Sequence, residues 1–289
     1  MPLEFKEHGF GCRLEVLPVE ELKIHEEIVP ELLKRLIGDM KSSGLVKDPI
    51  IADARTRVVL DGMHRVAASK ELGLKYLPVC SVDYSDPRIR IGCWYRVARS
   101  EGIQFGEIVR MLKLILALLG LDVRQSSMED AKNTVDGRRA TAALVTTDDC
   151  HLIAAKKTEI HESYAWIKRV ERVLKEEGFS LSYEKEKDAI ATLDKTSVVM
   201  LVPSVTKEEV VEVALSGKVF AHKTTRHVLP VRPVNMNIPV AWLLGGGLQD
   251  VDKKFVGKLS KQKVKHLPGG SAFGERKYEE ELLVFEEKQ

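Results

Sequence analysis

One short stretch of this chain carries side chains that could bind a phosphate group together with a metal ion. Asp61, His64 and Arg65 follow the apolar run 58–60 and precede good helix formers that end at Gly73. This pattern predicts a strand, a tight polar turn and a helix. A helix N-terminus attracts anions through its unpaired N–H groups and its dipole. The arginine and the histidine add donors, and the aspartate adds a hard oxygen ligand for Mg²⁺. An ordinary corner with a solvated arginine and a capping aspartate fits the same pattern.

A second row of hydrogen-bond donors runs from His222 to His227, with apolar residues on both sides. An exposed loop rarely needs six consecutive donors, whereas an anion site does. On these residues alone, an anion site and a plain loop both remain open.

A third stretch, His25-Glu26-Glu27, lies in the loop that enters a helix beginning at Pro30. A carboxylate in such a loop could act as a general base. Two exposed acidic residues that stabilise the helix dipole would look the same. The sequence does not distinguish Glu26 from Glu27 as the base.

The elements that must position these side chains alternate between strands and helices, which indicates an α/β (α+β) fold. Pro78 suggests an edge strand or an irregular start, and the polar stretch 126–139 resembles a mobile link. Strands are expected at 9–18, 49–53, 57–60, 76–82, 91–96, 142–145, 150–154, 181–183, 197–202 and 234–238. Besides the helix ending at Gly73, helices are expected at 30–44, 105–119, 162–177, 188–193, 206–217 and 239–244.

The chain has 289 residues, enough for two modest domains, and we expect a boundary near Ile103. The expected ranges are 1–103, 104–247 and a charged extension, 248–289. Alternating blocks of lysine and glutamate in the extension favour a solvated appendage over a nucleic-acid site.

Composition narrows the class of protein. A net charge of +2 gives no reason to expect nucleic acid as a partner, and a hydrophobic content of 44% supports real cores. The polar start and the short apolar segment 108–121 lead us to expect a cytoplasmic protein without a signal peptide or membrane span. Because no two of the four cysteines form a C-x-x-C pair, we expect them to be buried apolar residues rather than disulfides or zinc ligands. The sequence does not give the oligomeric state.

The corner at residues 61–65 resembles the nucleotide-phosphate element of the ParB/sulfiredoxin superfamily. Met63 stands where sulfiredoxins carry their catalytic cysteine, and a thioether has no thiolate. Archaeal ADP-dependent free L-serine kinases resemble the chain in three motifs in the same order: His25-Glu26 before a helix, residues 61–65 against Asp-Gly-His-His-Arg, and 223–230, which matches their C-terminal signature almost letter for letter. Their Trp-Tyr pair corresponds to Trp94-Tyr95, which by itself could wall a pocket or fill the core. The resemblance covers about residues 14–244.

This resemblance implies a ParB/sulfiredoxin-like N-terminal domain, a second α/β domain and a cleft between them. It implies transfer of a phosphoryl group from ADP, or from ATP, to free L-serine, giving O-phosphoserine for cysteine synthesis, with Mg²⁺ as cofactor. Glu26 would be the general base, and Asp61 would hold Mg²⁺ or orient the hydroxyl. The nucleotide phosphates would be held by Gly62, Met63, His64 and Arg65. Serine and the transferring group would be held by Trp94, Lys223, Thr224, Thr225, Arg226 and His227.

Two other classes of function remain alternatives to the kinase. A ParB-like DNA-binding or nuclease module would bind DNA tightly and in a salt-dependent manner, although no helix-turn-helix pattern is evident after residue 105. A non-catalytic nucleotide sensor would bind nucleotide without turnover.

Overall fold

The computed structural model describes residues 3–7, 9–100, 105–118, 120–154, 159–274 and 276–288. The chain divides into two compact units. Unit 1 comprises residues 1–90, 210–222 and 227–289, and unit 2 comprises residues 91–209 and 223–226. This division differs from the ranges expected from the sequence, because the segment after residue 226 returns to the N-terminal unit. Ile103, the expected boundary, lies outside the described residues.

Unit 1 is built on a five-stranded sheet in the order β1-β2-β6-β4-β5. The strands pair antiparallel except for β4 with β6. Apolar residues of the central strands, such as Leu14, Ile50 and Leu77, are fully buried. The strands are β1 (Leu3–Glu7), β2 (Phe10–Pro18), β4 (Ile50–Asp53), β5 (Val59–Asp61) and β6 (Tyr76–Val82).

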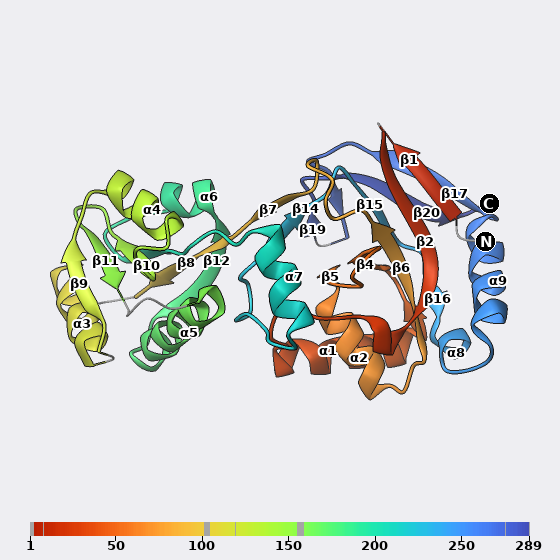
Figure 1. The fold of residues 1–289 in the computed structure, drawn as a ribbon, viewed down its shortest axis with the longest axis horizontal. Helices are drawn as coiled ribbons and strands as arrows, with labels where there is room; N and C mark the ends of the chain where they lie inside the picture. The colour runs from red at the N-terminus through yellow and green to blue at the C-terminus, as the bar shows by residue number, and fades with distance from the viewer. Residues whose placement is uncertain are drawn as a thin grey trace. The chain divides into compact units, whose positions relative to one another are not determined.

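Two helices of unit 1 lie side by side against this sheet, α1 (Pro30–Ser43) and α2 (Met63–Glu71) (Figure 1). Pro30 occupies the first helical position of α1, where a missing N–H costs nothing. Gly44 ends the helix in a left-handed conformation, with its N–H bonded to the carbonyl of Met40. Both expected helices are therefore confirmed.

The C-terminal segment is part of unit 1 and is not a solvated appendage. Helix α9 (Leu248–Leu259) packs on β2, and a three-stranded sheet has the order β15-β20-β17. The continuous apolar run 282–285 in β20 is buried, and the Phe285 ring lies edge-on to Phe5 of β1, 5.9 Å between centroids. The lysines of this segment favoured a solvated position in the prediction, but burial of the apolar run 282–285 holds the segment in unit 1. Its strands are β15 (Val231–Val234), β17 (Gln262–Leu267), β18 (Ala272–Phe273), β19 (Arg276–Lys277) and β20 (Glu281–Glu287).

Unit 2 contains a six-stranded sheet in the order β12-β8-β13-β10-β11-β9. Its core includes a fully buried cation: Arg96 donates to Glu171 at 2.6 Å and lies 5.5 Å from the rings of Tyr164 and Tyr183. The strands are β8 (Trp94–Arg99), β9 (Asp122–Gln125), β10 (Ala142–Val145), β11 (Cys150–Ala154), β12 (Ser180–Lys185) and β13 (Ser197–Leu201). The helices are α3 (Phe105–Leu118), α4 (Met128–Asp136), α5 (Ile160–Glu176) and α6 (Glu186–Ala191).

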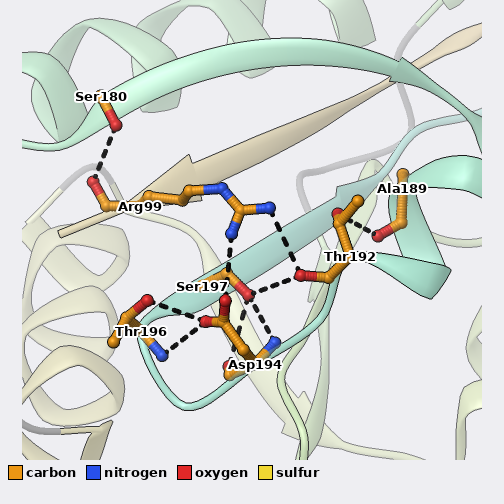
Figure 2. A network of polar contacts seen from close by, with 7 residues as sticks. All are labelled: Arg99, Ser180, Ala189, Thr192, Asp194, Thr196 and Ser197. Carbon is orange, nitrogen blue, oxygen red and sulfur yellow. Dashed lines mark hydrogen bonds and ion pairs between the residues drawn. The ribbon is translucent and has the colours of Figure 1, made fainter.

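Arg99, at the end of β8, holds the loop that enters β13 (Figure 2). Its guanidinium donates to the carboxylate of Asp194 and to the carbonyl of Thr192, both at 3.3 Å. Asp194 accepts at 2.8 Å from both the hydroxyl and the backbone N–H of Thr196. Because Ser180 of β12 also donates to the carbonyl of Arg99, these contacts fix β8 between its two neighbours.

Several local predictions were wrong, each for a physical reason. The stretch 126–139 contains helix α4, which Ser127 caps by accepting from the N–H of Asp130. Of the two alternatives expected at Pro78, the edge strand is wrong, because β6 is the middle strand, but the irregular start agrees with the structure, because the pairing of β6 with β4 begins only at Val79. The residue at 78 therefore has a single neighbouring strand. The expected strand 234–238 is interrupted by left-handed residues Asn235 and Asn237.

A few features of the remaining, mostly short elements were also predicted from the sequence. Thr206 and Glu209 form the expected capping box, with reciprocal hydrogen bonds of 2.8 and 3.2 Å. All four cysteines are buried and unbridged, as expected. None of the helices in the described ranges combines the length and apolarity needed to cross a bilayer. The remaining elements are η1 (Val19–Glu21), β3 (Leu45–Val46), β7 (Arg90–Gly92), α7 (Lys207–Leu215), β14 (Arg226–Val228), β16 (Ile238–Pro239) and α8 (Val240–Leu243).

Candidate active site

The turn between β5 and α2 forms the corner that the sequence predicts. Gly62, the residue before the helix, has φ +98°, a conformation that a side chain would strain. A Cβ at this position would lie 2.8 Å from both Nη2 of Arg65 and Cδ1 of Ile50. Glycine therefore allows the Arg65 guanidinium to lie against the backbone at the helix N-terminus.

The carboxylate of Asp61 is shared between two guanidinium groups. Its Oδ2 accepts from Nη2 of Arg65 at 3.0 Å and from Nη1 of Arg232 at 2.9 Å. Desolvation by burial favours a higher pKa, but the positive charges of Arg232 and Arg65 outweigh it and hold the pKa of Asp61 well below its usual range. Asp61 is therefore a firmly ionised acceptor.

Arg65 has donor capacity left over for a ligand. Its Nη2 also donates to the carbonyl of Pro49, at 3.2 Å, but its Nε is buried and has no hydrogen-bond partner among the residues that the structure describes. A buried N–H without an acceptor is costly unless a ligand supplies one. A phosphate oxygen at the N-terminus of α2 would satisfy it.

The segment 23–29, which contains Glu26, runs along β5 and the corner. The N–H of Val59 donates to the carbonyl of Lys23 at 2.9 Å, and the N–H of Val29 donates to Nε2 of His64 at 3.0 Å. The segment is thus pinned on both sides of Glu26, and the residue lies beside the turn. Glu26 is 5% exposed, so the expectation of an exposed acidic pair does not describe it.

The same segment pairs with residue 220, just before the donor row. The N–H of Phe220 donates to the carbonyl of His25 at 2.8 Å, and the N–H of Glu27 donates to the carbonyl of Phe220 at 2.9 Å. His222 follows at once, and its ring lies edge-on to that of His64, with 5.6 Å between centroids. Three stretches far apart in the sequence therefore meet within unit 1.

His64 and His227 are committed to the protein more fully than the sequence suggests. Because Nε2 of His64 accepts from the N–H of Val29, at the N-terminus of α1, this ring ties α1 to α2. Nε2 of His227 is hydrogen-bonded to the hydroxyl of Tyr84 at 2.7 Å, and the ring also bonds the backbone of Leu60. The geometry therefore favours His227 as a support for β5.

Two buried imidazoles are kept neutral beneath the corner. Burial lowers the pKa of His25 to about 4, against which its hydrogen bond with the backbone of Val59 acts. Burial, and then the neighbouring His25, lowers the pKa of His227 well below its ordinary value. The two rings lie edge-on, 5.5 Å apart. Neutral rings hold β5 without adding charge to the site.

A second group of expected site residues lies in unit 2. The indole N–H of Trp94 donates to the carbonyl of Thr225 at 3.1 Å, and Nζ of Lys223 lies 4.7 Å from the centroid of the Trp94 ring. The Arg226 guanidinium lies 5.9 Å from the same ring. Thr224 is fully buried. Trp94 therefore orders the short segment 223–226, which the chain enters from His222 and leaves at His227, both of unit 1.

The expected site residues are divided between the two units. Unit 1 brings together Glu26, Asp61, Gly62, Met63, His64, Arg65 and His227; unit 2 groups Trp94, Lys223, Thr224, Thr225 and Arg226. Sequence reasoning missed Tyr84, Arg232 and Glu280. A charged residue within the apolar run 231–234 was a usable signal for Arg232; Glu280, in an acidic stretch, carried none.

The donor set does not fit a metal ion held by the protein alone. Among the described residues, no group of three histidine, cysteine, aspartate or glutamate side chains could hold one. Asp61, the expected Mg²⁺ ligand, already neutralises Arg65 and Arg232. A cation at this site would therefore depend on oxygens of a bound ligand.

Comparisons with known proteins give several L-serine kinases and a ParB-like protein, although no protein-family model matches the chain. The chain is 32% identical over 234 residues to the ATP-dependent L-serine kinase of Staphylothermus marinus, covering 78% of this chain and 89% of that protein. It is 27% identical over 233 residues to the ADP-dependent L-serine kinase of Thermococcus kodakarensis, covering 77% and 89%. A solved structure, a free serine kinase in complex with AMP, superposes with a TM-score of 0.67 at 26% identity, covering 80% and 93%.

Proposed function

This chain belongs to the L-serine kinase family, and we propose that Glu26 is the base of the phosphoryl transfer it catalyses. The chain is a kinase that transfers a phosphoryl group from a nucleotide to free L-serine. The observation that carries the assignment of the base is the pinning of residues 23–29 along β5 and the start of α2. This pinning supports the proposal, because it holds the backbone of residue 26 along the strand and helix that form the corner suited to a phosphate.

The nucleotide phosphates bind at the N-terminus of α2 in this proposal. Its support is the unsatisfied Nε of Arg65, the absence of a side chain at Gly62, and the helix dipole. Met63 contributes its backbone N–H, and His64 holds the corner against α1. Asp61 orients Arg65 and accepts a hydrogen bond rather than coordinating a resident metal.

The chemical step requires alignment, charge neutralisation and one proton acceptor. The serine hydroxyl oxygen attacks the terminal phosphorus of the nucleotide, the bond from that phosphorus to the bridging oxygen breaks, and the hydroxyl proton passes to Glu26. The products are O-phosphoserine and AMP from ADP, or ADP from ATP. Mg²⁺, entering with the nucleotide, supplies further charge neutralisation when it is bound.

Serine recognition belongs in this proposal to the segment that Trp94 orders. Lys223 and Arg226 bring two positive charges and Thr224 and Thr225 bring hydroxyl and backbone donors, a set that suits a carboxylate and a phosphoryl group. His227, fixed by Tyr84, anchors the end of the segment. Because phosphate is a good leaving group at the serine β-carbon, we assign the product to cysteine synthesis.

The direct test incubates the protein with L-serine, Mg²⁺ and either ADP or ATP and follows O-phosphoserine by ³¹P NMR. We expect product with at least one donor. Nucleotide binding without product from either donor would refute the kinase function and support a sensor instead.

The base is tested by a matched pair of variants, Glu26→Gln and Glu27→Gln. Removing a general base lowers turnover about 10²–10⁴-fold, so the first variant should lose most of its kcat with the nucleotide Kd near that of the parent. The second should remain near the parent in both. The reverse pattern would move the base to Glu27.

Arg65→Ala tests the phosphate assignment. Hydrogen bonds to charged groups contribute about 1.5–3 kcal/mol, so the nucleotide Kd should rise about 10–100-fold by calorimetry. An unchanged Kd would remove Arg65 from the phosphate site.

A further inference from the structure

A chain of charged side chains links the C-terminal segment to the phosphate corner. Glu280 Oε1 accepts from Nε of Arg232 at 3.1 Å and from Nη2 at 2.8 Å. The remaining Nη1 of Arg232 donates to Oδ2 of Asp61 at 2.9 Å, and the same oxygen accepts from Arg65. Every member of this chain lies in unit 1.

The fold explains how residues so distant in sequence meet. Strand β15 pairs in parallel with β20, and Arg232 lies opposite Leu282 in this register. Glu280 comes two residues earlier, immediately before β20. Its second oxygen, Oε2, accepts from the N–H of Glu279 at 3.1 Å, so the carboxylate is held from both sides.

Burial restricts the positions that these charged side chains can take. The side chains of Arg232 and Glu280 are only 5% and 6% exposed. A buried guanidinium needs its charge balanced and its donors satisfied, because desolvation is costly. The guanidinium is planar, so an acceptor that engages Nε and Nη2 fixes the direction of Nη1. Glu280 thereby aims Nη1 at Asp61.

Asp61 transmits this constraint to the ligand-binding arginine. Its side chain is 30% exposed, and its Oδ2 is the meeting point of Arg232 and Arg65. With Arg232 fixed, that oxygen has one position, and Nη2 of Arg65 is held by it and by Pro49. The buried Nε of Arg65 is then left for a ligand oxygen.

We propose that Arg232 and Glu280 are positioning residues of the nucleotide phosphate site: Glu280 orients Arg232, Arg232 fixes the Asp61 carboxylate, and that carboxylate fixes Arg65. The C-terminal segment is accordingly a working part of the site. This inference rests on the proposed binding of nucleotide phosphates at Arg65.

A double-mutant cycle tests this chain, with Glu280→Gln and Asp61→Asn made singly and together. Glu280→Gln keeps the shape of the side chain and removes its charge. We expect it to raise the ADP Kd about tenfold by calorimetry and to lower kcat. In the Asp61→Asn background the same change should alter the Kd less than about twofold, because the connection is already cut.

The matched control is Glu171→Gln in unit 2, which removes the carboxylate of another buried arginine, Arg96. This pair lies within unit 2, whereas Asp61 belongs to unit 1, so its effect on the ADP Kd should be the same factor in both backgrounds. A loss of stability alone would therefore change the ADP Kd of Glu280→Gln and of Glu171→Gln in the same way. Only Glu280→Gln should show an effect on the Kd that depends on Asp61.

A milder variant protects the test against misfolding. Glu280→Asp keeps the charge, and should recover part of the ADP affinity lost in Glu280→Gln; it replaces that variant in the cycle if Glu280→Gln does not fold. The inference would be overturned if the Glu280 substitution changed the ADP Kd by the same factor in the parent and in Asp61→Asn. It would also be overturned if the substitution left the ADP Kd of the parent unaltered. A parent protein that binds ADP but forms no O-phosphoserine would refute the proposed function while the Kd cycle still decides the inference.

Discussion

Gly62→Ala offers a sharp test of the corner at residues 61–65, because the structure separates its consequences. The new Cβ would sit on a residue with φ +98° and lie 2.8 Å from both Cδ1 of Ile50 and Nη2 of Arg65. Carbon atoms in good contact lie about 3.5–4.0 Å apart. Backbone strain and an overlap of about 0.7 Å therefore act together.

Each contribution has an expected size. A left-handed backbone costs a residue other than glycine about 1–2 kcal/mol, and φ +98° is far from the favoured value near +57°. Overpacking a tight contact costs about 1–3 kcal/mol more. We therefore expect the free energy of unfolding to fall by about 2–5 kcal/mol. Arg65 can escape the overlap only by moving, so the nucleotide Kd should rise about tenfold or more.

The control lies at the other end of the same helix. Gly73 also has a positive φ, +69°, but a Cβ there would meet nothing within 4 Å. Gly73→Ala should therefore cost only the backbone strain, about 1 kcal/mol, and leave nucleotide binding unchanged. Urea unfolding gives the stability of both variants, and calorimetry with ADP gives their affinity.

The outcome is decided by the difference between the two variants. If Gly62→Ala destabilises the protein no more than Gly73→Ala, the overlap with Ile50 and Arg65 does not exist in solution. If Gly62→Ala binds ADP as tightly as the parent, the close approach of Arg65 to residue 62 has no part in phosphate binding.

Three further outcomes follow from the buried and aromatic contacts. Burial lowers the pKa of His25 from 6.5 to about 4, so between these pH values the unfolded chain binds a proton that the folded chain does not. The contribution of His25 to the free energy of unfolding should therefore fall by about 3 kcal/mol between pH 6.5 and 4. Urea unfolding at the two pH values should show a smaller fall in His25→Gln, and equal falls would contradict the assignment. Tyr84→Phe removes the 2.7 Å hydrogen bond to buried His227 and should cost about 1–3 kcal/mol in the same assay; no loss would mean that the ring finds another donor. Trp94→Leu removes the hydrogen bond to Thr225 and the cation–π contacts, and should raise the KM for serine about tenfold with a smaller change in kcat; a KM like that of the parent would separate this ring from serine binding.

Local signals in the sequence predicted much of the fold. The helix between the corner and Gly73, the start of α1 at Pro30 and the capping box of Thr206 and Glu209 each depend on residues within one or two turns. The mixed α/β class and the kinase family were also predicted, and both are confirmed. Short-range chemistry of this kind is written in consecutive residues, so a single sequence suffices.

Long-range packing accounts for the errors. The charged residues after Gly247 indicated an appendage, yet Leu282 and Phe285 pack into unit 1. Whether an apolar run lies in a core depends on the partner it meets, and β20 meets β15 in parallel, about fifty residues earlier. The pattern of charges along the sequence does not reveal that β15 is the partner of β20.

By itself, the sequence determined that Asp61, His64, Arg65 and the row 222–227 offer donors and an acceptor suited to phosphate. The tertiary structure decided which of those groups are still available. Nε2 of His64 already accepts a hydrogen bond from Val29. Nε of Arg65 stays available for a ligand, because Asp61 is held by Arg232, which lies 171 residues away in the sequence. A donor can bind a ligand only if no protein acceptor has taken it, and those acceptors come from strands that only folding brings together.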